Sequence, residues 1–308
     1  MHDPRQATDP TTERIAHHIG PAAIDIAYER LGDPQAPALV LIMGIAAQLI
    51  AWPDAFCQAL VGHGLQVIRF DNRDAGHSTH LTEAPPPDLP AALAGDFSSV
   101  SYTLSDMAAD TLGLMDALGI QRAHLVGASL GGAIAQTLAC EHPARVRSLV
   151  SMMSTTGAPT VGQISPDVVG EVFGGPPAVT REDVVHKTMR AMRAIGSPGY
   201  PIDETEVAVT AGRAYDRAYD PIGIARQAVA TIASGDRSER LRGLALPTLV
   251  IHGLADRMCD VSGGRATAAA IPDAELMLIE GMGHNFAPGL RLDLAKRIAD
   301  FVWRVERS

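Results

Sequence analysis

The sequence predicts an α/β fold in which a mostly parallel sheet has helices on both faces and carries an inserted helical cap. Three observations support this prediction. Short, continuous apolar runs alternate with helix-like segments through most of the chain, as is typical of buried parallel strands joined by helical crossovers. Two alternating segments near the start indicate an antiparallel hairpin. Comparable apolar runs are absent between residues 154 and 240 and return afterwards.

The first half of the chain contains most of the expected strands. Gly20-Pro21 separates the two alternating segments and marks the turn of the hairpin. Pro53 suits the first turn of a helix, where its missing N–H costs nothing. Residues 82–99 are rich in Pro, Ala and Ser and are expected to form a surface loop. The expected elements are strands at 14–19, 22–30, 38–43 and 66–70 and helices at 53–61 and 104–118.

The stretch AHLVGASLGGAIAQ, residues 123–136, contains Gly-x-Ser-x-Gly between an apolar run and helix-forming sequence. A serine at the tip of a tight strand-to-helix turn exposes its hydroxyl, and its neighbours must be small because the chains pass closely there. We therefore expect Ser129 to be a nucleophile, with an ordinary Gly-rich turn as the alternative. A helix is expected over 133–140 and another strand over 146–153.

Residues 154–240 are expected to form the helical cap. A helix over 180–195 places apolar side chains along one face, so it must lie on something apolar. The local repeat Arg213-Ala-Tyr-Asp, Arg217-Ala-Tyr-Asp indicates a solvated helix face. The members of the apolar face are Val184, Val185, Thr188, Met189, Met192 and Ile195.

Sheet-like sequence resumes after the cap, which defines the expected domain organisation. The α/β core comprises residues 14–153 and 241–308, the cap residues 154–240, and residues 1–13 a flexible tail. The last elements are expected to be strands at 247–252 and 275–279 and helices at 264–270 and 290–305.

Three candidate catalytic side chains follow the ends of different strands: Ser129, Asp256 and His284. The carboxyl ends of parallel strands share one edge of a sheet, so residues distant in sequence can meet there. Serine needs a base to take its proton and an acid to orient that base. Asp260 is an alternative acid, and His252 also ends a late strand.

A serine nucleophile that attacks a carbonyl group also needs backbone donors for the oxyanion that develops. One N–H is expected from Leu130, directly after the nucleophile, and the other from Ile45, in the loop after the strand ending at Met43. Gly44 permits a close turn in that loop. The alternative is that Gly44 serves the turn alone and has no part in an oxyanion site.

An apolar, adaptable pocket is expected under the cap. Methionine fills irregular space, so Met189 and Met192 of the cap are candidate wall residues, with packing in the core as the alternative. Further candidates are Gly44, Ile45, Trp52 and Leu130.

Composition limits the classes of ligand. The net charge of −10 and the pI near 5.5 offer no basic field for nucleic acid or anionic lipid. The three cysteines have no metal-ligand or disulfide-framework spacing, so we expect reduced thiols. No segment resembles a secretory signal or a membrane span. We expect a cytoplasmic monomer or homodimer that acts on a small molecule.

With these motifs the chain resembles the α/β-hydrolase superfamily over residues 14–303, and within it the bacterial esterase group that includes aclacinomycin methylesterase. The resemblance implies an eight-stranded core, a cap over the site, and ester hydrolysis without metal or organic cofactor. Alternatives with the same triad are a lactonase, a C–C bond hydrolase or a perhydrolase, and a non-catalytic receptor is a further alternative. The matching segments are MGI at 43–45, DNRDAGHS at 71–78, GASLGG at 127–132, HGLAD at 252–256 and GMGH at 281–284.

Overall fold

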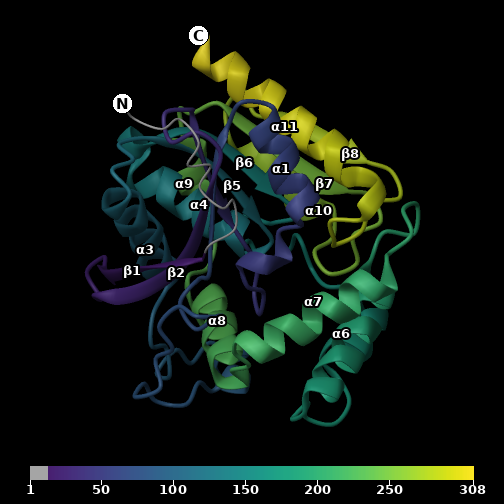
Figure 1. Cartoon of the computed structure of the whole chain (residues 1–308). Helices are drawn as coiled ribbons and strands as arrows, with labels where there is room; N and C mark the ends of the chain where they lie inside the picture. Colours follow the sequence, from purple (N-terminus) through teal and green to yellow (C-terminus); the bar gives the residue numbers. More distant parts are fainter. Residues whose placement is uncertain (1–12) are drawn as a thin grey trace, which may run out of the picture.

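The computed structural model describes residues 13–308 and contains an eight-stranded sheet with the order β1-β2-β4-β3-β5-β6-β7-β8 (Figure 1). β2 pairs antiparallel with β1 and with β4, and the remaining neighbours are parallel. The mostly parallel α/β fold is thus confirmed. The strands are β1 (Arg14–Ile19), β2 (Ile24–Leu31), β3 (Ala38–Ile42), β4 (Gln66–Phe70), β5 (Ala123–Ala128), β6 (Val146–Met152), β7 (Thr248–Gly253) and β8 (Glu275–Ile279).

Helices cover both faces of the sheet and enclose two hydrophobic cores. On one face α3 (Leu104–Ala117) and α4 (Leu130–Glu141) pack side by side, and on the other α1 (Asp54–Gly62) packs against α11 (Arg291–Glu306). Every residue of β4 and β5 is buried, because apolar side chains from the two layers cover both sides of these strands. α10 (Ser262–Ala270) joins β7 to β8.

All the helices of the inserted segment lie between β6 and β7 in the chain. Below the sheet in Figure 1, α8 lies on one side and the paired helices α6 and α7 on the other. α9 instead packs on α4 and α10, next to the sheet. The inserted helices are α5 (Val169–Phe173), α6 (Arg181–Ile195), α7 (Glu204–Arg217), α8 (Pro221–Ala233) and α9 (Ser238–Arg242).

Two local predictions need correction, and one cannot be compared. The loop expected at 82–99 contains a short helix, α2 (Leu89–Leu93), capped by the Asp88 side chain and packed on α8. The helix expected from Ala133 begins at Leu130, directly after the turn. Residues 1–12 of the predicted tail lie outside the described residues.

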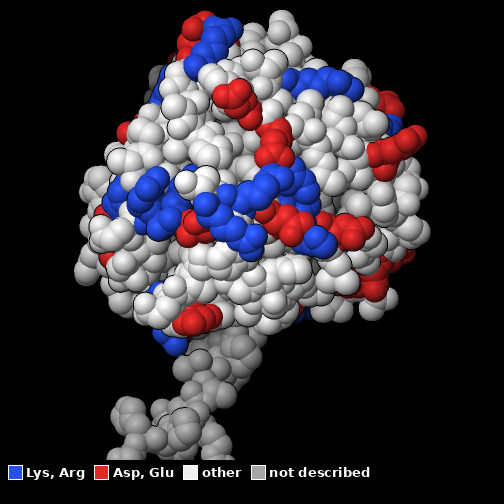
Figure 2. Space-filling model, turned by 90° about the horizontal axis from the view of Figure 1, so that it is seen from above, with Lys and Arg blue, Asp and Glu red and all other residues white. Residues whose placement is uncertain are grey.

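Surface charges are largely mixed in sign. Arg304 and Arg297 both pair with Glu275, and Arg147 pairs with Glu306. Figure 2 likewise shows a band of Lys and Arg side chains with Asp and Glu beside them. Within residues 13–308, no helix combines the length and apolarity needed to cross a bilayer.

Candidate active site

Ser129 occupies the turn between β5 and α4. Its backbone has φ 56° and ψ −121°, a conformation that residues other than glycine rarely adopt. The flanking glycines make this turn possible: a Cβ on Gly131 would lie 1.9 Å from the Ile42 carbonyl oxygen, and one on Gly127 would lie 2.1 Å from the Gly131 oxygen. The strained turn therefore has the geometry of a nucleophile elbow.

Asp256 and His284 come together from the loops after β7 and β8. His284 Nδ1 lies 2.7 Å from Asp256 Oδ2. Because a carboxylate can only accept, we assign the proton to Nδ1, which leaves Nε2 of His284 as an acceptor. Asp260, the alternative acid, instead accepts the Ser262 N–H.

The environment of Asp256 favours its charged form. Its side chain is fully buried, and its second oxygen, Oδ1, accepts the backbone N–H groups of Met258 and Cys259 at 2.9 and 2.8 Å. Burial by itself raises the pKa of this carboxyl, but the charge of His284 and hydrogen bonds from His252, His284 and Cys259 outweigh it and hold the pKa well below its usual range. A permanent anion thus faces Nδ1 of His284.

His252 does not share the site of His284. Its side chain is completely buried, its Nε2 donates to the Cys259 carbonyl at 2.8 Å, and the same nitrogen lies 3.5 Å from Asp256 Oδ2. His252 therefore stabilises the charged form of Asp256 from within the core, whereas His284 lies in the wall of a cavity.

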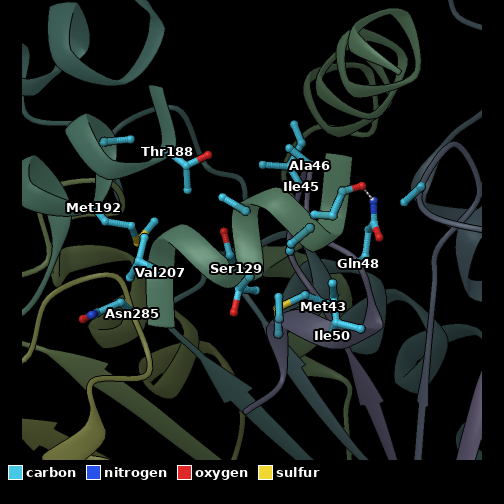
Figure 3. Close-up of a pocket in the computed structure, with 18 of the residues that line it drawn as sticks. Met43, Ile45, Ala46, Gln48, Ile50, Ser129, Thr188, Met192, Val207 and Asn285 are labelled. Carbon is cyan, nitrogen blue, oxygen red and sulfur yellow. Dashed lines mark hydrogen bonds between the residues drawn. The ribbon is translucent and has the colours of Figure 1, made fainter. Parts of the chain in front are cut away.

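Ser129 and His284 line one cavity of about 520 Å³ between the sheet and the cap (Figure 3). Its walls are mainly apolar. Figure 3 shows Ser129 near the centre, with Met43 and Ile45 from the loop after β3 on one side and Met192 and Val207 from α6 and α7 on the other. The catalytic candidates thus open onto a space that could hold an apolar small molecule.

The loop after β3 passes close to the serine. A Cβ on Gly44 would lie 3.0 Å from Ser129 Cβ and 3.5 Å from Oγ. Within residues 13–308, the N–H groups of Ile45 and Leu130 have no protein acceptor. Leu130 is the first residue of α4, where the helix leaves its N–H groups free. Two unpaired donors therefore flank the position of Ser129.

The predicted wall residues divide into two groups. Gly44, Ile45 and Met192 line the cavity, whereas Leu130 is buried beneath it. Trp52 is not in the wall: it is completely buried, stacks on Phe56 with ring centroids 5.6 Å apart and also contacts Phe286. Met189 is likewise buried outside the wall, because it lies about 100° around α6 from Thr188, which does line the cavity.

Arg217 corrects the interpretation of the Arg-Ala-Tyr-Asp repeat as a solvated face. Its side chain is 13% exposed and forms ion pairs with Asp71 and Glu13. It also donates to Gln48 Oε1 at 2.7 Å. Arg213, at the equivalent position of the first copy, is exposed as expected.

The sequence did not predict a group of polar contacts between the cap and the core. Gln48 donates to the carbonyls of Ala214 and Ala218, and Gln227 contacts the loop after β3. The sequence feature that pointed to these contacts was the density of polar residues in 71–78. It does not identify partners more than 130 residues away in the chain.

One cluster in the described part of the chain has the composition of a metal site. Ligand atoms of Asp74, His80 and Asp220 lie within 4.8 Å of one another. However, the Arg226 guanidinium pairs with Asp74 at 2.8 Å and lies 3.5 Å from Asp220. A built-in cation already balances these carboxylates, so we assign no metal to them.

Known proteins resemble this chain over most of its length. A family model described as the alpha/beta hydrolase fold matches residues 37–287. A rhodomycin D methylesterase of Streptomyces peucetius is 29% identical over 296 residues, which cover 88% of this chain and 92% of the relative. A 2-hydroxymuconate semialdehyde hydrolase of Pseudomonas putida is 28% identical over 195 residues, 59% of this chain and 63% of the relative.

Among solved structures, the enol-lactonase from Burkholderia xenovorans LB400 matches with a TM-score of 0.70 and 24% identity, covering 94% of this chain and 99% of that chain. This match supports the fold alone. The residues matched by the family model include Ser129, Asp256 and His284.

Proposed function

The chain belongs to the α/β-hydrolase fold family, and from that premise we propose that it is a carboxylic ester hydrolase whose catalytic residues are Ser129, His284 and Asp256. The observation that carries the proposal is the shared cavity: a strained, half-buried serine and a histidine oriented by a buried carboxylate line the same mainly apolar space. Acyl transfer by a serine uses a histidine that a carboxylate orients, so the shared cavity supports the proposal.

The proposed reaction proceeds in two balanced halves. Ser129 Oγ attacks the ester carbonyl while His284 Nε2 accepts the serine proton, and Asp256 stabilises the imidazolium that forms. The N–H groups of Ile45 and Leu130 bind the oxyanion. The tetrahedral intermediate collapses, the alcohol leaves with the proton from His284, and an acyl-enzyme remains. Water then attacks this ester by the same route and releases the acid.

The substrate is proposed to be a small to medium, largely apolar ester. The cavity volume of about 520 Å³ and its mainly apolar walls favour an apolar group over a charged one. The name of the relative, a rhodomycin D methylesterase, supports methyl esters as candidate substrates.

A C–C bond hydrolase is the main alternative, because a 2-hydroxymuconate semialdehyde hydrolase is among the relatives. Lactonase and perhydrolase chemistry would use the same triad. Including a vinylogous 1,5-diketone acid, a lactone and hydrogen peroxide with an acid in the substrate panel separates these activities from ester hydrolysis. Binding without turnover of any of them would indicate a receptor.

The decisive experiment combines a substrate panel with three variants. Chromogenic esters of graded acyl length should be hydrolysed by the wild-type chain, and Ser129→Ala should lose about 10³-fold or more in kcat. Asp256→Asn should lose a comparable factor, because the histidine proton would move to the wrong nitrogen. Asp260→Asn is the matched control, since the Asp260 side chain accepts the Ser262 N–H within its own turn, and should retain wild-type kcat.

Near-full activity in Ser129→Ala would refute the proposed nucleophile. Equal losses in Asp256→Asn and Asp260→Asn would refute the assignment of the acid. Because His284 must be neutral to accept a proton, activity is expected to fall in acid.

A further inference from the structure

The loop that carries the Ile45 N–H is held from the cap side by the side chain of Gln227. Gln227 belongs to α8 and is completely buried. Its Oε1 accepts the Ala46 N–H at 3.1 Å, and its Nε2 donates to the Arg73 carbonyl at 2.8 Å. One amide thus joins the loop after β3 to the loop after β4.

The contact falls on the strained residue of a turn. The Ala47 N–H lies 3.4 Å from the Gly44 oxygen, so Ile45 and Ala46 are the central residues of a tight turn. Ala46 has φ 61°, the sign that a type II turn requires at this position and that favours glycine. Alanine would be less strained if the 45–46 peptide were flipped, as in a type I turn.

Gln227 opposes that flip. The Oε1 acceptor is satisfied only when the Ala46 N–H points toward α8, and a flipped peptide would present the Ile45 carbonyl to it instead. Burying an unpaired amide oxygen carries a free-energy cost comparable to the strain at Ala46. The hydrogen bond therefore decides which form of the turn is populated.

A second glutamine also joins this loop to the cap, but here the glutamine belongs to the loop. Gln48, which is 4% exposed, donates through Nε2 to the Ala214 and Ala218 carbonyls at 2.8 and 2.9 Å, at the end of α7. Figure 3 shows Gln48 extending to this backbone across the cavity wall. On the sheet side, Asn72 Nδ2 donates to the Met43 carbonyl at 3.0 Å. The loop is thus held between cap and core at three points.

We propose that Gln227 is a positioning residue for the oxyanion hole: by holding the Ile45–Ala46 peptide it fixes the turn at 44–47, and so keeps the adjoining Gly44–Ile45 peptide, which carries the Ile45 N–H, beside the carbonyl oxygen bound at Ser129. The inference rests on the proposed ester hydrolase activity. It makes the cap a participant in transition-state stabilisation rather than only a cover for the cavity. Because the oxyanion exists only after attack, Gln227 should affect kcat rather than substrate binding.

The test uses Gln227→Met, which has a similar volume and no amide. kcat for a chromogenic ester should fall about tenfold with KM unchanged. The affinity for an alkyl boronic acid, which adds Ser129 Oγ to boron and forms a tetrahedral anion, should fall by the same factor. The affinity for the neutral alcohol product should stay at the wild-type value.

Gln136→Met is the matched control. Gln136 is another fully buried glutamine with two hydrogen bonds, and these join it to Ser151 and Arg237 rather than to the loop after β3. It should lower the thermal midpoint of unfolding without lowering kcat of the folded enzyme. If Gln227→Met does not fold, Gln227→Asn carries the test, since its shorter amide cannot reach Ala46 and Arg73 together.

The outcomes separate the two levels of the proposal. If the wild-type chain hydrolyses the ester and Ser129→Ala does not, but the folded Gln227 variant keeps full kcat and boronate affinity, the positioning role is wrong and the ester hydrolase assignment stands. A parallel loss of kcat in Gln136→Met would also overturn the positioning role. If the wild-type chain hydrolyses no ester, the proposed function itself fails.

Discussion

The two sides of the cap meet the sheet domain through different chemistry. On the α8 side the contacts are buried polar side chains: Arg226 pairs with Asp74 at 2.8 Å, with both side chains at most 3% exposed. On the α6 side two ion pairs are exposed. Arg193 pairs with Glu204 within the cap, and Asp167 of the cap pairs with Arg257 of the core. Further contacts with the core on this side are backbone hydrogen bonds, the Ser197 hydroxyl bonded to Asn285 Oδ1, and the apolar cavity wall.

This difference separates stability from selectivity. A buried ion pair that loses one partner leaves an uncompensated charge, whereas an exposed pair is screened by water. Substitutions on the α8 side are therefore expected to destabilise the fold, and substitutions in the α6 wall to change which esters are hydrolysed.

The largest effect is expected from Arg226→Met. Asp74 would keep the Tyr102 hydroxyl but lose its buried cation, so the free energy of unfolding should fall by about 3 kcal/mol in urea titrations. Arg193→Met on the α6 side is the control and should cost below about 1 kcal/mol. Equal losses in the two variants would remove the distinction between the two sides.

An intermediate effect is expected from the two methionines of α6. Met192 lines the cavity and is half-buried, whereas Met189 is buried outside it. Met192→Ala should change the preference among esters of graded acyl length several-fold, whereas Met189→Ala should lower the free energy of unfolding by about 2 kcal/mol with the preference unchanged. If instead Met189→Ala changed selectivity, the assignment of the wall would be reversed.

The smallest effect is a pH dependence at His80. Its Nδ1 lies 2.8 Å from Asp220 Oδ2 at the start of α8, and its Nε2 lies 3.0 Å from the Gly76 carbonyl. Both partners are acceptors, so the protonated ring satisfies them best. Partial burial lowers the pKa of His80, but the hydrogen bonds to Gly76 and Asp220 outweigh it and raise the pKa above its ordinary value.

Because the pKa of His80 is raised in the folded state, its protonation stabilises the fold. This stabilisation is complete at pH values below the ordinary histidine pKa and is lost as the pH rises through the folded-state pKa. The thermal midpoint of the wild-type chain should therefore decline from about pH 6 upward, and His80→Gln should have a shallower decline. His186→Gln is the control, because His186 lies exposed on α6; a matching change in that variant would argue against the role of His80.

The sequence predicted the sheet better than the cap because apolar runs report burial directly. The bounds expected for β4 and β8 match those observed, and the glycines around Ser129 predicted the turn. α2 was missed because five residues contain too little periodicity. Trp52 was assigned to the wall because sequence position places it near the loop but does not give the direction of its ring.

The polar contacts of the cap could not be predicted for a different reason. Arg217 resembles Arg213 in its local sequence, yet only Arg217 meets a buried carboxylate, Asp71, from a strand end 146 residues earlier. Gln227 similarly depends on where α8 is placed over the loop after β3. Such pairings are properties of the tertiary structure, and the residue types alone admit many partners.

The end of α6 has a practical consequence for protein engineering. The Ile195 carbonyl accepts the His284 N–H at 2.7 Å, the Gly199 N–H donates to the Gly281 carbonyl at 2.9 Å, and a Cβ on Gly283 would lie 2.2 Å from the Gly196 oxygen. The cap is therefore not an interchangeable module. A chimera that takes its cap from a relative must keep the backbone hydrogen bonds between residues 195–199 and 281–284. Without them the loop that carries His284 would lose its contact with the end of α6.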